Sequence, residues 1–256
     1  MSMLEIHQFG CLSDNYGFLV HDADAGLTAC IDTPDAGPTL AALDAKGWSL
    51  THIWNTHWHP DHTGGNLELR EKTGCAILGP RNESERIPGI QTELTEGSRF
   101  DFGAHPVRVF DVPGHTSGHI AYYLPDDAVA FVGDTLFALG CGRLFEGTAE
   151  QMWHSLGKLM ALPPETVVYC AHEYTQANAR FALSVDPENE ALAERSKEID
   201  ALRDQGVATV PTTIGAELAT NPFLRAEDSG LQRALGMEGA DPVSVFAETR
   251  KRKDNF

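Results

Sequence analysis

The sequence lacks any long run of apolar residues. Crossing a lipid bilayer takes about 18 consecutive apolar residues, and no stretch of the chain reaches that length. The first residues, Met1 to His7, have neither the basic start nor the apolar block of a secretory signal peptide. We therefore predict a cytoplasmic protein with no membrane partner.

Cysteine is scarce and irregularly spaced. The chain has five cysteines, an odd number, and none of them forms a CxxC pair. This pattern argues against a disulfide framework and fits reduced thiols in the cytoplasm. Cys141, between two glycines, could suggest a nucleophile, but no matching histidine base is apparent.

Basic residues are also few. The chain has 19 Lys and Arg against 37 Asp and Glu, which gives a net charge of −18. Such an excess of acid repels a phosphate backbone, so we expect no binding to nucleic acid. The exception is the end of the chain, where residues 250–253 read Arg-Lys-Arg-Lys. This tail is either a binding site for an anion or a solvated helix end whose cations favour the helix dipole.

What the chain does contain is a dense histidine cluster. Residues 55–66 read Asn-Thr-His-Trp-His-Pro-Asp-His-Thr-Gly-Gly-Asn, so three imidazoles and one carboxylate fall within six positions. Neutral imidazole and carboxylate are the usual ligands of zinc, iron and manganese. The proline and the two glycines predict a strand end that runs into a loop before a helix. The alternative, a His-rich loop that only caps backbone groups, does not require an aspartate at this spacing.

Hydrophobic periodicity predicts an α/β protein with a helical end. We expect strands at 3–9, 16–21, 27–31, 50–56, 75–78, 107–112, 119–124, 128–132 and 166–170. We expect helices at 37–45, 66–72, 149–160, 176–184, 188–205, 231–235 and 243–253. Asp186 is expected to cap the helix that follows it, with Pro187 as its first residue. The order of elements indicates an α/β sandwich with a C-terminal helical domain packed on it.

Three strands of the second half run into polar loops. These loops contain residues 113–119 (Pro-Gly-His-Thr-Ser-Gly-His), 133–135 (Gly-Asp-Thr) and 171–174 (Ala-His-Glu-Tyr). Because sites gather at the C-terminal ends of strands in such sheets, we expect the loops to converge on the histidine cluster. Among the remaining histidines, His119 is the one expected to orient a ligand.

The polar residues of these loops, together with the histidine cluster, form a series. This series resembles the metallo-β-lactamase superfamily. Its parts are His-x-His-x-Asp-His at 57–62, Gly-His-Thr at 114–116, Gly-Asp-Thr at 133–135 and His172. More narrowly, segments 12–16, 133–147, 171–175 and 221–223 with the basic tail resemble glyoxalase II, the hydroxyacylglutathione hydrolases. The resemblance covers almost the whole chain. It implies an α/β fold, an αββα metallo-β-lactamase sandwich, with a catalytic domain at 1–173 and a helical glutathione-binding domain at 174–256.

The resemblance also implies a metal site with two divalent ions. Seven side chains would hold them: His57, His59 and His115 the first ion, Asp61, His62 and His172 the second, and Asp134 both. Because no thiolate belongs to the set, zinc, iron and manganese all fit, and zinc is the one we expect. Asp61 and Asp134 would be the catalytic carboxylates, and a metal-bound hydroxide would be the nucleophile.

The implied reaction is hydrolysis of S-(2-hydroxyacyl)glutathione thioesters, chiefly S-D-lactoylglutathione to D-lactate and glutathione, which detoxifies methylglyoxal. A thiolate leaves easily because the pKa of its conjugate acid is about 8.5, so no strong general acid is needed. Arg143, Tyr174, Arg250 and Lys253 match the positions that bind glutathione in the family. Phe145 stands where many relatives have tyrosine, so that contact loses its hydroxyl.

Two other functions fit the same fold. A glutathione persulfide dioxygenase with one iron normally lacks the second-metal ligands and the helical extension, so Asp61 and His62 count against it. A non-catalytic binding module would not require an unbroken ligand series. We therefore expect a monomeric binuclear hydrolase whose partner is a small glutathione thioester.

Overall fold

The structure is a computed structural model, and it describes residues 4–256. The first residue of the strand expected at 3–9 lies outside the described residues. The described chain forms two compact units. Unit 1 contains residues 4–111 and 117–133, and unit 2 contains residues 112–116 and 134–256.

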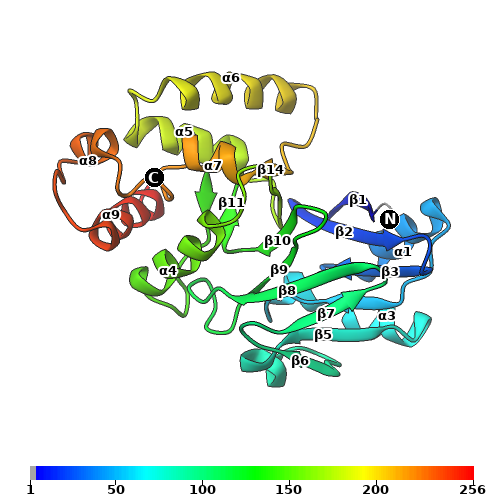
Figure 1. Cartoon of the computed structure of the whole chain (residues 1–256). Coiled ribbons are helices and arrows are strands. Elements are labelled where there is room, and N and C mark those ends of the chain that lie inside the picture. The colour runs from blue at the N-terminus through cyan, green and yellow to red at the C-terminus, as the bar shows by residue number, and fades with distance from the viewer. Residues whose placement is uncertain (1–3) are drawn as a thin grey trace. The chain divides into compact units, whose positions relative to one another are not determined.

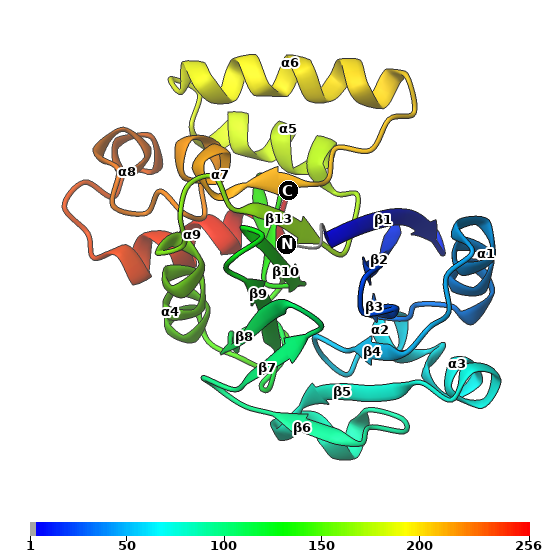
Figure 2. The ribbon, with the colours of Figure 1, turned by 45° about the vertical axis from the view of Figure 1, so that its right-hand side comes forward.

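Unit 1 contains a six-stranded mixed sheet in the order β1-β2-β3-β4-β5-β6 (Figures 1 and 2). The strands are β1 (Leu4–Cys11), β2 (Asn15–Asp22), β3 (Leu27–Ile31), β4 (His52–Trp54), β5 (Ala76–Pro80) and β6 (Thr92–Leu94). The first three strands pair antiparallel, and β3 to β6 pair parallel. Parallel neighbours need crossover connections, and these connections carry the helices of the unit.

The crossovers of this sheet contain α1 (Ala36–Lys46), α2 (Pro60–Thr63), α3 (Asn66–Thr73) and the 3₁₀ helix η1 (Arg81–Arg86). Helices α1 and α3 cover the same face of the sheet (Figure 2). Leu43 of α1 and Leu69 of α3 are buried in one apolar cluster with Ile53 and Ile77 of the strands. This cluster fixes β4, the strand that leads into the histidine loop.

Four further strands of unit 1 pair antiparallel in the order β10-β9-β8-β7. They are β7 (Arg99–Phe102), β8 (His105–Asp111), β9 (Ile120–Leu124) and β10 (Val129–Gly133). Their inner face packs on the first sheet through Trp54, whose ring lies 5.2 Å from Phe100, 5.1 Å from Phe102 and 5.3 Å from Tyr122. The prediction of two packed sheets is confirmed.

Unit 2 is mainly helical. It contains β11 (Leu136–Phe137), β12 (Gly140–Cys141), α4 (Ala149–Met160), β13 (Val167–Cys170), α5 (Thr175–Val185), α6 (Glu190–Asp204), β14 (Thr212–Thr213), α7 (Ile214–Thr220), α8 (Ser229–Leu235) and α9 (Pro242–Asp254). Helices α5 and α6 lie side by side (Figures 1 and 2). Ala179, Ala182, Leu192 and Ile199 are buried between them with Leu139. The predicted C-terminal helical region is confirmed, and no helix of residues 4–256 could cross a membrane.

One expected helix start is wrong. Asp186 ends α5 as its C-cap, and the N-cap of α6 is Asn189, whose side-chain oxygen accepts a hydrogen bond from the Leu192 amide at 3.0 Å. The carboxylate of Asp186 is instead bound by the Asn189 amide at 2.9 Å and by Arg225 at 3.2 Å. Both contacts are made by Oδ2 of Asp186, which therefore binds side chains instead of capping α6.

Candidate metal centre

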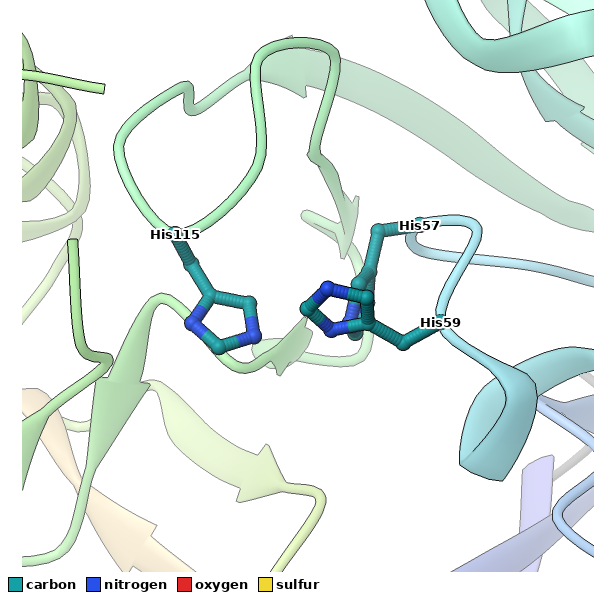
Figure 3. Close-up of side chains that lie close together, drawn as sticks. All are labelled: His57, His59 and His115. Atoms are coloured by element: carbon teal, nitrogen blue, oxygen red, sulfur yellow. The ribbon is translucent and has the colours of Figure 1, made fainter. Parts of the chain in front are cut away.

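The histidine loop of unit 1 follows β4. Pro60 is the first residue of the short helix α2, so the chain turns immediately after His59 and carries Asp61 and His62 on the helix. His57 is fully buried, and its Nε2 atom lies 2.9 Å from Nδ1 of His59, with the two rings edge to face (Figure 3). Two ring nitrogens this close are placed to share one proton or one cation.

His62 and Asp61 form the second part of this loop. Nε2 of His62 lies 3.6 Å from Oδ2 of Asp61, and His62 is almost completely buried. Asn15 donates its side-chain amide to Oδ2 of Asp61 at 3.1 Å and to the Asp61 carbonyl at 3.2 Å. The carboxylate of Asp61 is therefore held in position from the first residue of β2.

Asp32, just after β3, is a functional residue that sequence reasoning missed. Its carboxylate is buried and accepts hydrogen bonds from the amide and hydroxyl of Thr56, both at 2.8 Å, and it lies 2.8 Å from Nδ1 of His62. An acceptor at Nδ1 favours the tautomer whose Nε2 lone pair is open to a metal. The sequence feature that could have pointed to Asp32 is its position, because it is an acidic residue directly after a predicted strand.

His119 supports the same loop. It is fully buried in unit 1, and its ring stacks on that of His57 at a centroid distance of 4.6 Å and an interplanar angle of 20°. The ring restricts the rotamers open to His57. This contact fits the orienting role expected of His119.

Unit 2 brings together three of the residues singled out from its polar loops. His115 (Figure 3), Asp134 and His172 are all buried and follow β8, β10 and β13 respectively. Nε2 of His115 lies 3.3 Å from Oδ2 of Asp134, and Nε2 of His172 lies 3.4 Å from Oδ1 of the same carboxylate. Each oxygen of Asp134 thus faces one imidazole, the arrangement of a carboxylate that can be shared between two cations.

The local backbone sets this geometry. Nδ1 of His115 lies 2.9 Å from the carbonyl oxygen of Arg143, which directs Nε2 towards Asp134. A Cβ atom on Gly142 would overlap the carbonyl oxygen of Asp134 and approach Nδ1 of His115 to 3.1 Å. Only glycine therefore fits at position 142.

The donor chemistry of both clusters fits a divalent cation. The donors are imidazole nitrogens and carboxylate oxygens, most of them buried, and unpaired charges of one sign would be costly there. The set suits zinc, iron or manganese.

The four residues matched to glutathione binding all lie in unit 2. Tyr174 stacks on His172 with a centroid distance of 4.7 Å and an interplanar angle of 3°. Arg143 is exposed, whereas Arg250 is buried and donates to the Cys141 carbonyl at 2.9 Å and pairs with Asp254 at 2.8 Å. The guanidinium of Arg250 therefore also holds the β11–β12 hairpin.

Lys253 is the most perturbed cation of this group. Its Nζ atom donates to the carbonyl of Ala177 at 3.2 Å. Burial, together with the positive charges of Arg250, Arg180 and Arg143, lowers the pKa of Lys253 to about 8. Such a concentration of positive charge in a protein of net charge −18 suits an anionic ligand.

Comparison with known proteins identifies the family. Residues 173–256 match the family described as hydroxyacylglutathione hydrolase C-terminus, and residues 22–172 match the metallo-beta-lactamase superfamily. The chain is 58% identical over 256 residues to the hydroxyacylglutathione hydrolase of Maricaulis maris, covering 100% of both chains. The chain belongs to the hydroxyacylglutathione hydrolase family. The resemblance inferred from the sequence is confirmed, and the protein is a metal-dependent hydrolase.

Solved structures agree on the fold. ETHE1 from Myxococcus xanthus matches with a TM-score of 0.67 and 25% identity, covering 97% of this chain and 98% of that one. A protein solved in a di-iron-bound form matches with a TM-score of 0.62 and 27% identity, covering 86% of this chain and 100% of that one. The predicted fold class, a metallo-β-lactamase sandwich with a C-terminal helical region, is confirmed.

The structure also describes the surroundings of Phe145 and Cys141, two residues noted in the sequence. Phe145 is exposed, and its ring lies edge-on to His115 at 5.2 Å. Cys141 is buried, and burial raises the pKa of its thiol to about 11. Because the thiolate is the nucleophilic form, this cysteine is a poor nucleophile at neutral pH.

The β11–β12 hairpin joins Asp134 to Arg143 and is held by helical side chains that bind its main chain. Asn178 donates to the carbonyl of Ala138 at 3.1 Å, and Glu217 accepts from the amide of Leu139 at 2.8 Å. Asn221 donates to two further hairpin carbonyls, at 3.2 and 3.0 Å. Glu217 and Asn221 are fully buried, so this family's helical extension fixes the hairpin as well as supplying cations.

Proposed function

We propose that this hydrolase of hydroxyacylglutathione thioesters acts chiefly on S-D-lactoylglutathione and releases D-lactate and glutathione. The observation that carries the proposal is the buried carboxylate of Asp134, whose oxygens lie 3.3 and 3.4 Å from the imidazoles of His115 and His172. A carboxylate between two ligand histidines suits a two-metal hydrolytic site.

The proposed centre holds two divalent ions, zinc in preference to iron or manganese. Its ligands are His57, His59 and His115 for the first ion, Asp61, His62 and His172 for the second, and Asp134 for both. Three considerations support this assignment: the residue types, the short distances between ligand atoms within each unit, and family membership. The di-iron-bound relative supports the number of ions.

The bound ions would supply a water of lowered pKa and would polarise the thioester carbonyl. The protein's own part is to hold the ligands rigidly. Asp32 keeps the Nδ1 proton of His62 in place, and the carboxylates of Asp61 and Asp134 contribute the negative charge that balances the cations. Departure of a thiolate, whose conjugate acid has a pKa of about 8.5, requires no acidic side chain.

We further propose that Arg143, Tyr174, Arg250 and Lys253 bind the glutathione moiety. Glutathione carries two carboxylates, and the net charge of −18 would repel them without local cations. Phe145 offers an aromatic face without a hydroxyl at its position. The division into a catalytic domain at 1–173 and a glutathione-binding domain at 174–256 stays a prediction.

Release of free thiol from S-D-lactoylglutathione tests the assignment directly. His57→Ala, or removal of metal by a chelator, should abolish the release, because metal-dependent hydrolysis loses its water activation. His154→Ala is the matched control, since His154 is an exposed residue of α4. Unchanged thiol release by His57→Ala would contradict the proposal.

The persulfide dioxygenase alternative is not favoured by the family match. Elemental analysis separates the two activities: the hydrolase should contain two metal ions per chain, and the dioxygenase one iron.

We also propose a cytoplasmic monomer without nucleic-acid or membrane partners. The scattered free thiols support the cytoplasm, and the net charge of −18 argues against nucleic acid. Light scattering would measure the oligomeric state.

A further inference from the structure

Unit 1 contains a buried carboxylate that the proposed reaction does not use. Glu83 lies in η1, far along the chain from any of the proposed ligands, and only 1% of its surface is exposed. A buried carboxylate is costly unless its oxygens are hydrogen-bonded. The donors that bind the two oxygens of Glu83 therefore show which part of the fold this carboxylate holds.

Both carboxylate oxygens of Glu83 accept hydrogen bonds from main-chain amides. Oε2 accepts from the amide of Trp58 at 2.9 Å, and Oε1 accepts from the amide of Gly118 at 2.8 Å. Trp58 stands between His57 and His59, and Gly118 directly precedes His119. Glu83 thus joins the ligand loop to the segment whose histidine stacks on His57.

Two further contacts indicate that this junction is specific. The guanidinium of Arg86, in the same turn, lies 3.4 Å from the centre of the Trp58 ring. A Cβ atom on Gly118 would come within 2.7 Å of Glu83 Cγ and 2.8 Å of Asn82 Cβ. The close approach of η1 to this segment therefore requires a glycine at position 118.

We propose that Glu83 is a positioning residue that sets the main chain between His57 and His59 in the geometry that binds metal. This inference rests on the proposed ligand roles of those two histidines. Glu83 accepts a hydrogen bond from the amide of Trp58, the residue between the two histidines, and acts through this amide. Charge-assisted bonds from a carboxylate to main-chain amides are about twice as strong as neutral ones, so the loop is held before the metal arrives.

Glu83→Gln tests the inference with almost no change in volume. The glutamine has one acceptor oxygen and one amide group, so either Trp58 or Gly118 loses its acceptor and faces a second donor. We expect the dissociation constant for Zn²⁺, measured by chelator competition without substrate, to rise about tenfold to hundredfold, the range found for outer-shell partners of metal ligands. Glu85→Gln is the matched control, since Glu85 is exposed on the same turn, and its zinc affinity should equal that of the unsubstituted protein.

Amide proton shifts of the metal-free protein separate positioning from a general loss of structure. The amide resonances of Trp58 and Gly118 should move in Glu83→Gln while the rest of the spectrum is retained. An unchanged zinc affinity, or a loss of affinity accompanied by a general change of the spectrum, would overturn the proposal.

A second measurement requires no variant. In the metal-free, unsubstituted protein the amides of Trp58 and Gly118 should be protected from hydrogen exchange, and rapid exchange at both would also overturn the inference. None of these measurements involves the thioester. Normal zinc binding without thiol release would therefore count against the proposed function alone.

Discussion

At the scale of single residues, the proposed role of Lys253 in binding glutathione predicts that substrate binding depends on pH. Its pKa is about 8 because of burial and the neighbouring Arg250, Arg180 and Arg143. As pH rises through 8 the ammonium loses its proton, so the attraction for a glutathione carboxylate weakens. We predict that KM for the thioester rises above pH 8 while kcat changes little.

Lys253→Arg provides the control for this profile. An arginine stays charged throughout the accessible pH range, so its KM should show no rise in the same interval. A KM for the unsubstituted protein that is flat across pH 8 would contradict a role of Lys253 in binding.

Asp32 gives a second prediction at this scale. Its carboxylate holds Nδ1 of His62 and two groups of Thr56 at 2.8 Å each. Asparagine tolerates the positive φ of 54° at this position. In Asp32→Asn, however, the new side-chain NH₂ group faces Thr56 or His62, which donate to the carboxylate. We expect zinc affinity to fall about tenfold or more, measured by chelator competition, and Asp44→Asn on the exposed side of α1 to leave it unchanged.

The sequence reveals ligand candidates better than it reveals their supports. His57, His59, Asp61 and His62 stand out because metal-binding residue types crowd within a few positions. A lone aspartate such as Asp32 looks like an ordinary turn residue, because its partners lie 24 and 30 positions away. Supports of this kind depend on long-range contacts that spacing does not encode.

At the scale of elements, α4 is the clearest case of local sequence deciding structure. It spans Ala149–Met160, the range predicted, and begins with a capping box formed by Thr148 and Gln151. Thr148→Ala should lower the free energy of unfolding by about 1 kcal/mol, measured by urea denaturation. Thr148→Ser keeps the capping hydroxyl and should retain most of that stability.

The β11–β12 hairpin gives the second prediction for an element. Asn221→Ala removes the donors to the carbonyls of Phe137 and Gly140, and leaving buried acceptors unsatisfied costs about 1–3 kcal/mol. We expect lower stability together with a fall in kcat/KM, because the hairpin connects Asp134 to Arg143. Gln205→Ala, at the exposed end of α6, should leave both quantities unchanged.

Elements without a strong local signal were predicted less well. Helix α7 was not predicted, because it is short and is held by side chains such as Glu217, whose partner Leu139 is 78 positions away. The strand expected at 50–56 is limited to His52–Trp54, because the amide of Thr56 turns to Asp32. Asp186 and Pro187 match the sequence pattern of a helix start. The carboxylate of Asp186 binds Asn189 and Arg225 instead, and Asn189 caps α6.

At the scale of the whole molecule, metal binding should stabilise the folded chain. The proposed ligands are separated in sequence by up to 115 positions, from His57 to His172, so the unfolded chain binds an ion poorly. Each tenfold increase in the ratio of free metal to dissociation constant should add about 1.4 kcal/mol to the free energy of unfolding. Calorimetry with and without a chelator measures this, and His57→Ala should lose the part of the difference that the first ion contributes.

The hairpin between Asp134 and Arg143 has a consequence for how this enzyme can diverge. Asn178, Glu217 and Asn221 bind its main chain, so its path does not depend on which side chains it presents. Phe137, whose ring packs edge-on against His172 and Tyr174, can be exchanged without losing those anchors. Evolution, or a library of variants at this one position, can therefore reshape the surroundings of His172 and Tyr174 while the hairpin keeps its path.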